Sequence, residues 1–290
     1  SNNTGVGYLA LRSNTTGTQN VAVGANALDA NTTASNNTAV GHDALTSNTT
    51  GGNNVAFGQG ALKNNTTANT NTALGKDALE FNTTGADNTS IGAFSLNSNT
   101  TGTRNVAVGS RVLDSNTTAN DNTAIGDQSL TTVTTGNTNT AIGQSAGFNI
   151  STGSNNILIG HNAGTSNSPI GGLTTDNNRI CLGNNSNDFL ACKVSLTATS
   201  DKRDKTDITD FTHGLSWITK LRPVTYRWDM RSNYEDGVPN GSKKEEKLNL
   251  GLIAQEELEI EKEHGFANDK NDMLLVNENS DGNYGMQYDR

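Results

Sequence analysis

The chain has 290 residues, a formal net charge of −9 and a hydrophobic content of 32%, which is enough length for two domains of ordinary size. The charged residues form no basic stripe, so nucleic acid is not an expected partner. No apolar run has the length of a membrane span, no signal peptide is visible, and the only two cysteines, Cys181 and Cys192, make neither a disulfide framework nor a metal site by themselves.

The first half of the chain is an internal repeat. A glycine recurs every seventeen residues from Gly7 to Gly160, in ten copies without an insertion or deletion. Each copy has an Asn four residues before this glycine, then a strand-like segment with a small residue between two larger ones. Ala-Leu and Asn-Thr-Thr follow the glycine in most copies. A fixed period of this kind predicts a solenoid.

The period also predicts the shape of each coil. Seventeen residues suffice for two short strands and two turns, which make one coil of a parallel β-roll. Alternation along the strand sends its first and third residues to one face and its small middle residue to the other. The repeat glycine supplies a positive φ or a close approach of backbones. The Asn before each strand predicts a ladder of side-chain amides along the stack.

A single coil supplies only four or five apolar side chains, most of them small, so a lone roll has a thin core. We therefore expect the Ala and Leu after each repeat glycine to face other chains in a parallel homotrimer. The repeats resemble the head repeats of trimeric bacterial autotransporter adhesins and related repeats in phage tail fibres. This resemblance implies trimeric, left-handed β-rolls.

Other features of the array have simpler explanations than a site. Each Asn-Thr-Thr is formally a glycosylation acceptor, but turn chemistry accounts for it better. The lone histidines His42 and His161 make no metal site. The scattered acidic residues provide no pair of carboxylates for a glycosidase. We therefore expect no cofactor, no metal and no activity on an external substrate.

The composition changes twice along the chain. The period breaks after residue 164, and a degenerate copy, Asn178–Gly183, follows an inserted stretch. We expect repeats over residues 1–164, an atypical cap and linker over 165–199, and a separate α+β domain over 200–290. In the last domain, spacing predicts helices near 214–221 and 255–264 and a strand at 224–228. His213 and His264 are expected at its surface rather than in catalysis.

Residues 200–290 carry three blocks that occur together in one known family: Ser200–Ile208, Leu221–Trp228, and Gly251–Leu258 followed by Tyr284–Arg290. They resemble the intramolecular chaperone domain of phage endosialidases and tail fibres, a family of self-cleaving serine peptidases, over about ninety residues. Members usually continue into a long C-terminal helix that forms a trimeric coiled coil. This sequence stops at Arg290, so either the helix lies outside it or this copy is shortened.

The resemblance implies a Ser/Lys dyad that cuts the chain between Thr199 and Ser200. Ser200 would attack the carbonyl of Thr199, and Lys205 would act as general base, which requires a neutral amine. Arg203 and Asp201 are the supporting residues. On the dyad alone a polar linker with a chance Ser and Lys is the better explanation. The three blocks together favour a peptidase that acts once on its own chain.

The two halves suggest one function. A repeat this regular specifies register poorly, because a slip of seventeen residues preserves almost every contact. A trimerising C-terminal domain would align the chains and could then be discarded. We interpret the protein as a phage tail fibre or tailspike of the virion, with itself, other tail proteins and a host glycan or outer-membrane receptor as partners. The alternative is a bacterial trimeric surface adhesin with the same chaperone, and a depolymerase is a weaker third possibility.

Overall fold

The computed structural model describes residues 2–187, 210–231, 234–235, 237–269, 273–278 and 284–286. It divides into two compact units, Ser1–Asp188 and Phe189–Arg290. Within these described ranges, no helix is long and apolar enough to cross a membrane.

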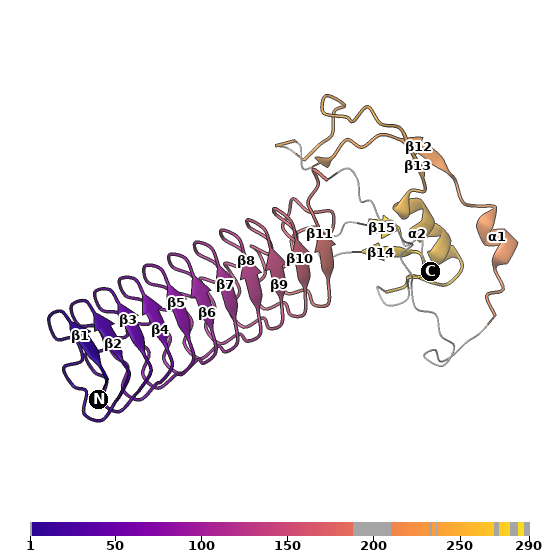
Figure 1. The fold of residues 1–290 in the computed structure, drawn as a ribbon. Coiled ribbons are helices and arrows are strands. Elements are labelled where there is room, and N and C mark those ends of the chain that lie inside the picture. The colour runs from indigo at the N-terminus through magenta and orange to yellow at the C-terminus, as the bar shows by residue number, and fades with distance from the viewer. Residues whose placement is uncertain are drawn as a thin grey trace. The chain divides into compact units, whose positions relative to one another are not determined.

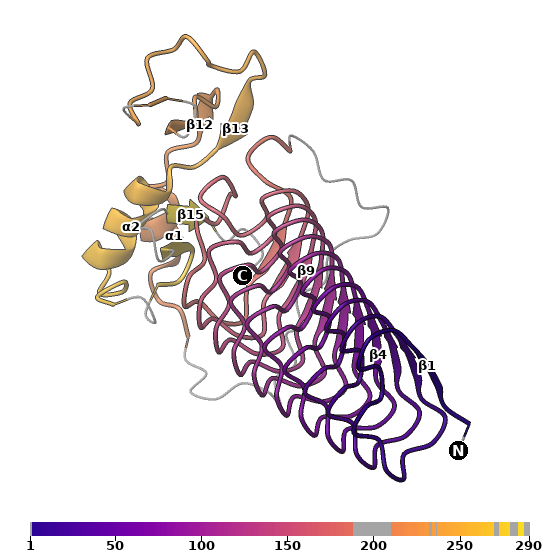
Figure 2. The ribbon, with the colours of Figure 1, turned by 90° about the vertical axis from the view of Figure 1, so that its left-hand side faces the viewer.

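The first unit is a parallel β-solenoid, as the sequence predicted (Figures 1 and 2). The prediction of two short strands per coil is wrong: each described coil has one three-residue strand, and turns with positive φ at residues such as Asn26 and Leu28 take the place of the second. Each strand pairs in parallel with the strand of the next coil, so eleven strands form one sheet in sequence order. The strands are β1 (Thr4–Val6), β2 (Val21–Val23), β3 (Thr38–Val40), β4 (Val55–Phe57), β5 (Thr72–Leu74), β6 (Thr89–Ile91), β7 (Val106–Val108), β8 (Thr123–Ile125), β9 (Thr140–Ile142), β10 (Ile157–Ile159) and β11 (Ile180–Leu182). The left-handed coiling of the roll and its trimeric state stay predictions.

The strand alternation is confirmed. In β2 the middle residue, Ala22, is fully buried, whereas Val21 and Val23 are each 36% exposed. The same pattern of a buried middle residue between less buried neighbours holds from β2 to β11. The small residue thus points into the coil, and the larger β-branched or aliphatic residues point outward.

The expectation that the Ala-Leu pair faces other chains is wrong. Ala27 and Leu28 are both fully buried within their own chain. The leucine lies in the left-handed backbone region, with φ of 51° at Leu28 and between 49° and 53° at its equivalents from Leu45 to Leu130. This conformation turns its side chain into the coil, where it packs with the strand alanines in one continuous core. The thin core is therefore filled from within one chain.

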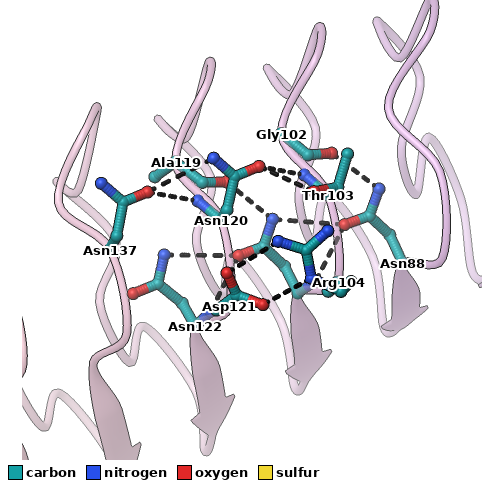
Figure 3. A network of polar contacts seen from close by, with 10 residues as sticks. Asn88, Gly102, Thr103, Arg104, Ala119, Asn120, Asp121, Asn122 and Asn137 are labelled. Carbon is teal, nitrogen blue, oxygen red and sulfur yellow. Dashed lines mark hydrogen bonds and ion pairs between the residues drawn. The ribbon is translucent and has the colours of Figure 1, made fainter.

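The predicted Asn ladder is confirmed, and it is tied to the backbone (Figure 3). The backbone N–H of Asn105 donates to Oδ1 of Asn88 at 3.0 Å, and that of Asn122 donates to Oδ1 of Asn105 at 3.0 Å. Nδ2 of Asn105 donates to the carbonyl of Ala119 at 2.8 Å. All three side chains are fully buried, so each amide satisfies backbone groups that would otherwise lie unpaired in the core.

A second ladder runs through the Asn of the Asn-Thr-Thr motif. Nδ2 of Asn99 donates to Oδ1 of Asn82 in the preceding coil at 2.8 Å and to the carbonyl of Gly102 at 3.0 Å. These side chains are also fully buried. The motif is thus turn chemistry, and the buried amide leaves no room for a glycan in the folded coil.

The array ends with one longer coil. Strand β11 pairs with β10 so that Ile180 lies opposite Ile157, and the equivalent residues are 23 apart instead of 17. The extra residues form an excursion in which Oγ of the buried Ser168 donates to the carbonyl of Gly171 at 2.9 Å and Leu173 is buried. The degenerate copy at 178–183 is therefore a further coil of the same sheet.

The second unit is a small α+β structure. It contains α1 (Gly214–Ile218), β12 (Val224–Tyr226), β13 (Asn249–Gly251), α2 (Ala254–Glu263), β14 (Val276–Glu278) and β15 (Tyr284–Met286). Strand β12 pairs antiparallel with β13, and β14 pairs antiparallel with β15. A core forms where α2 meets the β14–β15 hairpin, from Ala254, Leu258, Ala267 and Val276. Both predicted helices and the predicted strand exist, but α1 is shorter than the predicted 214–221.

Candidate functional site

The predicted cleavage site lies outside the described residues. This holds for Thr199 and Ser200 at the scissile bond, for Lys205 as the base, and for the supporting Asp201 and Arg203. The dyad therefore stays a prediction from the sequence. The described part of the same domain shows what holds that domain together.

Helix α2 organises the second unit. Its buried residues are Ala254, Glu257, Leu258, Ile260 and Glu261. Ala254, Leu258 and Glu261 recur at three- and four-residue spacing, which places them on one side of a helix. Two carboxylates, Glu257 and Glu261, thus share the buried side of a helix whose sequence reads as charged and solvent-exposed.

Glu257 connects α2 to α1. The indole Nε1 of Trp217 donates to Oε1 of Glu257 at 2.6 Å, and both side chains are buried. Burial raises the pKa of Glu257 and the neighbouring Glu261 carboxylate raises it further, while the hydrogen bond from Trp217 lowers it. A buried carboxylate that accepts an indole N–H is stable only while this bond is kept, so the pair fixes α1 against α2.

Glu261 holds the chain segment that leads into β14. Its carboxylate accepts three backbone N–H groups, from Leu274 at 3.0 Å, Leu275 at 2.6 Å and Val276 at 3.1 Å. The side chain is fully buried. A carboxylate with three converging N–H donors resembles an anion bound in a turn, so Glu261 serves as an internal anchor for this segment.

An aromatic cluster surrounds Trp217. The ring of His213 lies 4.9 Å from that of His264, and Phe211 contacts both His213 and Trp217 edge-on at 5.5 and 5.2 Å between ring centroids. Phe266 completes the cluster. Both histidines are half-buried rather than surface residues, because they pack in this cluster. Among the described residues no group of three metal-ligating side chains occurs.

Two exposed ion pairs join the segment after α1 to α2. Nζ of Lys220 lies 2.7 Å from Oε2 of Glu263, and the guanidinium of Arg222 forms two hydrogen bonds to the carboxylate of Glu256. These hydrogen bonds lower the pKa values of Glu263 and Glu256. Exposed pairs contribute little stability each, but they fix the orientation of the residues that follow α1.

The described geometry therefore provides a clamp in which α2 binds both α1 and the β14 segment. Reasoning from sequence named neither Glu257 nor Glu261 nor the Trp217 contact. The three- and four-residue spacing from Ala254 through Leu258 to Glu261 was a usable signal, since it places both glutamates beside apolar positions.

Comparison with known proteins adds one finding. Residues 200–266 match the family model of a peptidase family described as the chaperone of endosialidase. No curated protein and no solved structure matches the chain. The match spans α1 and α2, and it begins at Ser200, the residue expected to act as nucleophile. Together with the β-solenoid, the match fits a protein whose C-terminal part is an endosialidase-type chaperone.

Proposed function

We propose that this protein is a trimeric fibre or tailspike whose C-terminal chaperone aligns three chains and is then released by self-cleavage. The observation that carries the proposal is the chaperone match, which begins at Ser200, C-terminal to a solenoid of nearly identical coils. Such a solenoid needs an external device to set its register.

The need for a register device follows from the contacts between coils. Backbone and amide hydrogen bonds between coils join equivalent residues, such as Asn88 to Asn105 and Asn105 to Asn122. Because the same contacts recur in each coil, chains shifted by one coil would differ little in energy. A separate domain that associates first would remove this degeneracy.

The second unit carries surface suited to association. Large apolar side chains lie exposed on it, with Leu215 and Leu250 each 76% exposed. Several such residues on a small domain are typical of a surface that binds a partner. The exposed apolar residues are Phe211, Leu215, Ile218, Trp228, Val238, Leu248 and Leu250.

The proposed cleavage uses only residues of this chain and water. Oγ of Ser200 attacks the carbonyl carbon of Thr199 while its proton passes to the neutral amine of Lys205. The C–N bond breaks as the Ser200 nitrogen takes up a proton, which leaves an ester between Thr199 and the Ser200 oxygen. Water then hydrolyses the ester to a carboxylate at Thr199 and a free hydroxyl at Ser200. Losing the chaperone removes the route back to separated chains, so the rod becomes kinetically stable.

The test is the intact mass of the expressed full chain and of two variants. We expect the wild type to yield one fragment ending at Thr199 and one beginning at Ser200. Ser200→Ala and Lys205→Ala should both remain uncut, because each removes one partner of the dyad. Ser195→Ala and Lys202→Ala are matched controls that should be cut normally.

Cutting of both dyad variants at the wild-type rate would overturn the cleavage mechanism. A wild type with the native mass of a single chain would overturn the trimeric function. For the biological setting, we propose a virion fibre that contacts a glycan or outer-membrane component of a host. Antibodies against residues 1–187 should then label purified phage tails, and labelling of a bacterial envelope instead would identify a surface adhesin.

A further inference from the structure

We propose that the outward side of the eleven-strand sheet is the surface through which copies of this chain pack together, parallel and in register. We call this surface the outer strand face and define it by the first and third residues of β1 to β11. The inference rests on the proposed trimeric function and assigns its contact surface within the first unit.

The outer strand face is an exposed apolar stripe. The third residue of each strand is Val, Ile, Leu or Phe, and Phe57 is 52% exposed. The first residue is Val, Ile or Thr. The exposed large apolar members are Val6, Val21, Val23, Val55, Phe57, Leu74, Ile125, Ile142, Ile157, Ile159, Ile180 and Leu182.

These side chains are not part of the buried core of their own chain. The coil interior is already filled by the middle strand residues and by the Ala-Leu pair, which are fully buried. The first and third residues of β2 to β11 are exposed or partly exposed, whereas the middle residue between them is buried. Large apolar residues held outward in coil after coil are costly in water unless another surface covers them.

Charge is distributed as at a protein interface. None of the eleven strands contains a charged residue. The column two residues before the strands carries Asp87, Arg104 and Asp121, and the column just after the repeat glycine carries Lys76 and Asp127. An uncharged apolar centre between polar borders is the usual anatomy of a protein–protein contact.

The area of the outer strand face is comparable to that of a functional apolar patch. Eleven strands stacked about 4.8 Å apart extend over roughly 50 Å, and three residues span about 10 Å, which gives a strip of about 500 Å². The largest apolar patch of an ordinary monomer is about 300–600 Å² and is often functional. The strip supplies a large part of the roughly 800 Å² per partner of a stable interface, and the polar borders add to it.

Another copy of the same face is the occupant that fits. A partner must offer apolar groups at about 4.8 Å intervals over the whole length. Among the described residues of the first unit, the exposed large apolar side chains lie on the outer strand face, apart from Tyr8 and Phe81. Parallel copies in register also bring equal residues to equal heights. Phe57 is the sole aromatic residue in the eleven strands, so a slip by one coil would place it against Val40 or Leu74 of the next chain.

The first experiment is crosslinking of the full chain with a short bis-maleimide. Ile125→Cys places a thiol on the outer strand face, and Thr118→Cys places one on an exposed position of a different side of the coil. Both variants carry Cys192→Ser, and the remaining Cys181 is buried. We expect Ile125→Cys to give covalently linked chains in high yield, at least tenfold above Thr118→Cys.

The second experiment measures the native mass of a double variant that places two carboxylates on the outer strand face. Ile125→Glu with Ile142→Glu should shift the native mass from three chains toward one, because like carboxylates would face each other across the contact. Thr118→Glu with Thr135→Glu should leave the trimer intact. Both pairs alter exposed positions, and circular dichroism verifies that the coil is folded. If the first pair fails to fold, the crosslinking result decides.

The outcomes separate the two proposals. A trimeric wild type with efficient crosslinking at Thr118 and none at Ile125 would overturn the outer strand face while the trimeric function stands. If the variant with both Glu substitutions is folded and still trimeric, the outer strand face is likewise overturned and the trimeric function stands. A monomeric wild type would overturn the proposed function, and this inference with it.

Discussion

Each full coil bends at residues held in an uncommon backbone conformation. The coil around β2 has positive φ at Gln19, Asn26 and the buried Leu28, with values of 59°, 60° and 51°. For an L-residue with a side chain this conformation costs about 1–2 kcal/mol. Leucine adopts this unfavourable conformation in successive coils because the turn brings its side chain into the core. The ladder amides and the burial of the leucine offset the strain.

The repeat glycines cannot be replaced. Gly75 has φ of 142°, and a Cβ there would lie 2.5 Å from the carbonyl oxygen of Gly92 in the next coil. Gly75→Ala should therefore destabilise the rod by about 3 kcal/mol or more, from backbone strain plus the clash. Urea unfolding followed by circular dichroism measures the loss.

Gly5 is the matched control for Gly75. It occupies the middle of β1, where most other strands have Ala, and a Cβ there would meet its nearest atom at 3.5 Å. Gly5→Ala should leave the unfolding midpoint unchanged or raise it slightly. An equal loss in the two variants would contradict the role assigned to the repeat glycine.

Thr138 is a position where a substitution should stabilise. It has a positive φ of 57°, which is unfavourable for a β-branched residue, and equivalent positions carry Asn36, Asn53 and Asn155. Thr138→Asn should raise the free energy of unfolding by about 1 kcal/mol. Thr118→Asn, at an exposed site without positive φ, should leave it unchanged. A loss of stability in Thr138→Asn would show that φ strain does not limit this turn.

At the scale of elements, the stability of the second unit should depend on pH through the buried Glu257 of α2. Burial raises the pKa of Glu257 above its ordinary value of 4.5, so the folded state favours the protonated acid. Its contribution to stability is complete below the unfolded pKa and is lost as the pH rises through the folded value. Glu257→Gln keeps an acceptor for Trp217 and should remove this loss, so the variant gains stability relative to wild type above about pH 4.5.

Glu263 gives the opposite sign and serves as the control. The hydrogen bond from Lys220 lowers the pKa of Glu263, so its small contribution is present above the unfolded pKa and is lost as the pH falls. Glu263→Gln should therefore lose a little stability at neutral pH, where Glu257→Gln gains it. Thermal unfolding of the second unit between pH 3.5 and 7.5 compares the two variants.

The period allowed the strands, their alternation and the first Asn ladder to be predicted, because each depends on residues that recur at fixed spacing. The direction of the Ala-Leu pair could not be predicted the same way. A leucine at φ near +50° is rare, so the residue pattern alone did not indicate a turn that brings this side chain into the coil. In the second unit, Glu261 binds residues 13–15 positions away and Glu257 binds Trp217 from 40 positions away, and such distant contacts follow from tertiary packing.

At the scale of the whole molecule, the two units solve different problems. The first unit is a linear array in which each coil contacts its neighbours, so stability accumulates coil by coil. The second unit carries no repeat, and one helix joins its parts through single specific contacts. Because the contacts between coils are nearly equal, the array does not specify register by itself, whereas a non-repeating domain can. The Ser200–Lys205 dyad, proposed to separate the two, stays a prediction.

The uniform ladder of contacts also makes length a variable that can change in whole steps. If residues 71–87 were deleted, Asn88 would take the place of Asn71. The hydrogen bond that the backbone N–H of Asn71 donates to Oδ1 of Asn54 would form again with the N–H of Asn88 as donor. The coils on either side of the deletion would pair as neighbouring coils do now, and the solenoid would be shorter by about 4.8 Å. Recombination between equal repeats could thus lengthen or shorten such a rod by whole coils, while both ends of the molecule keep their structure.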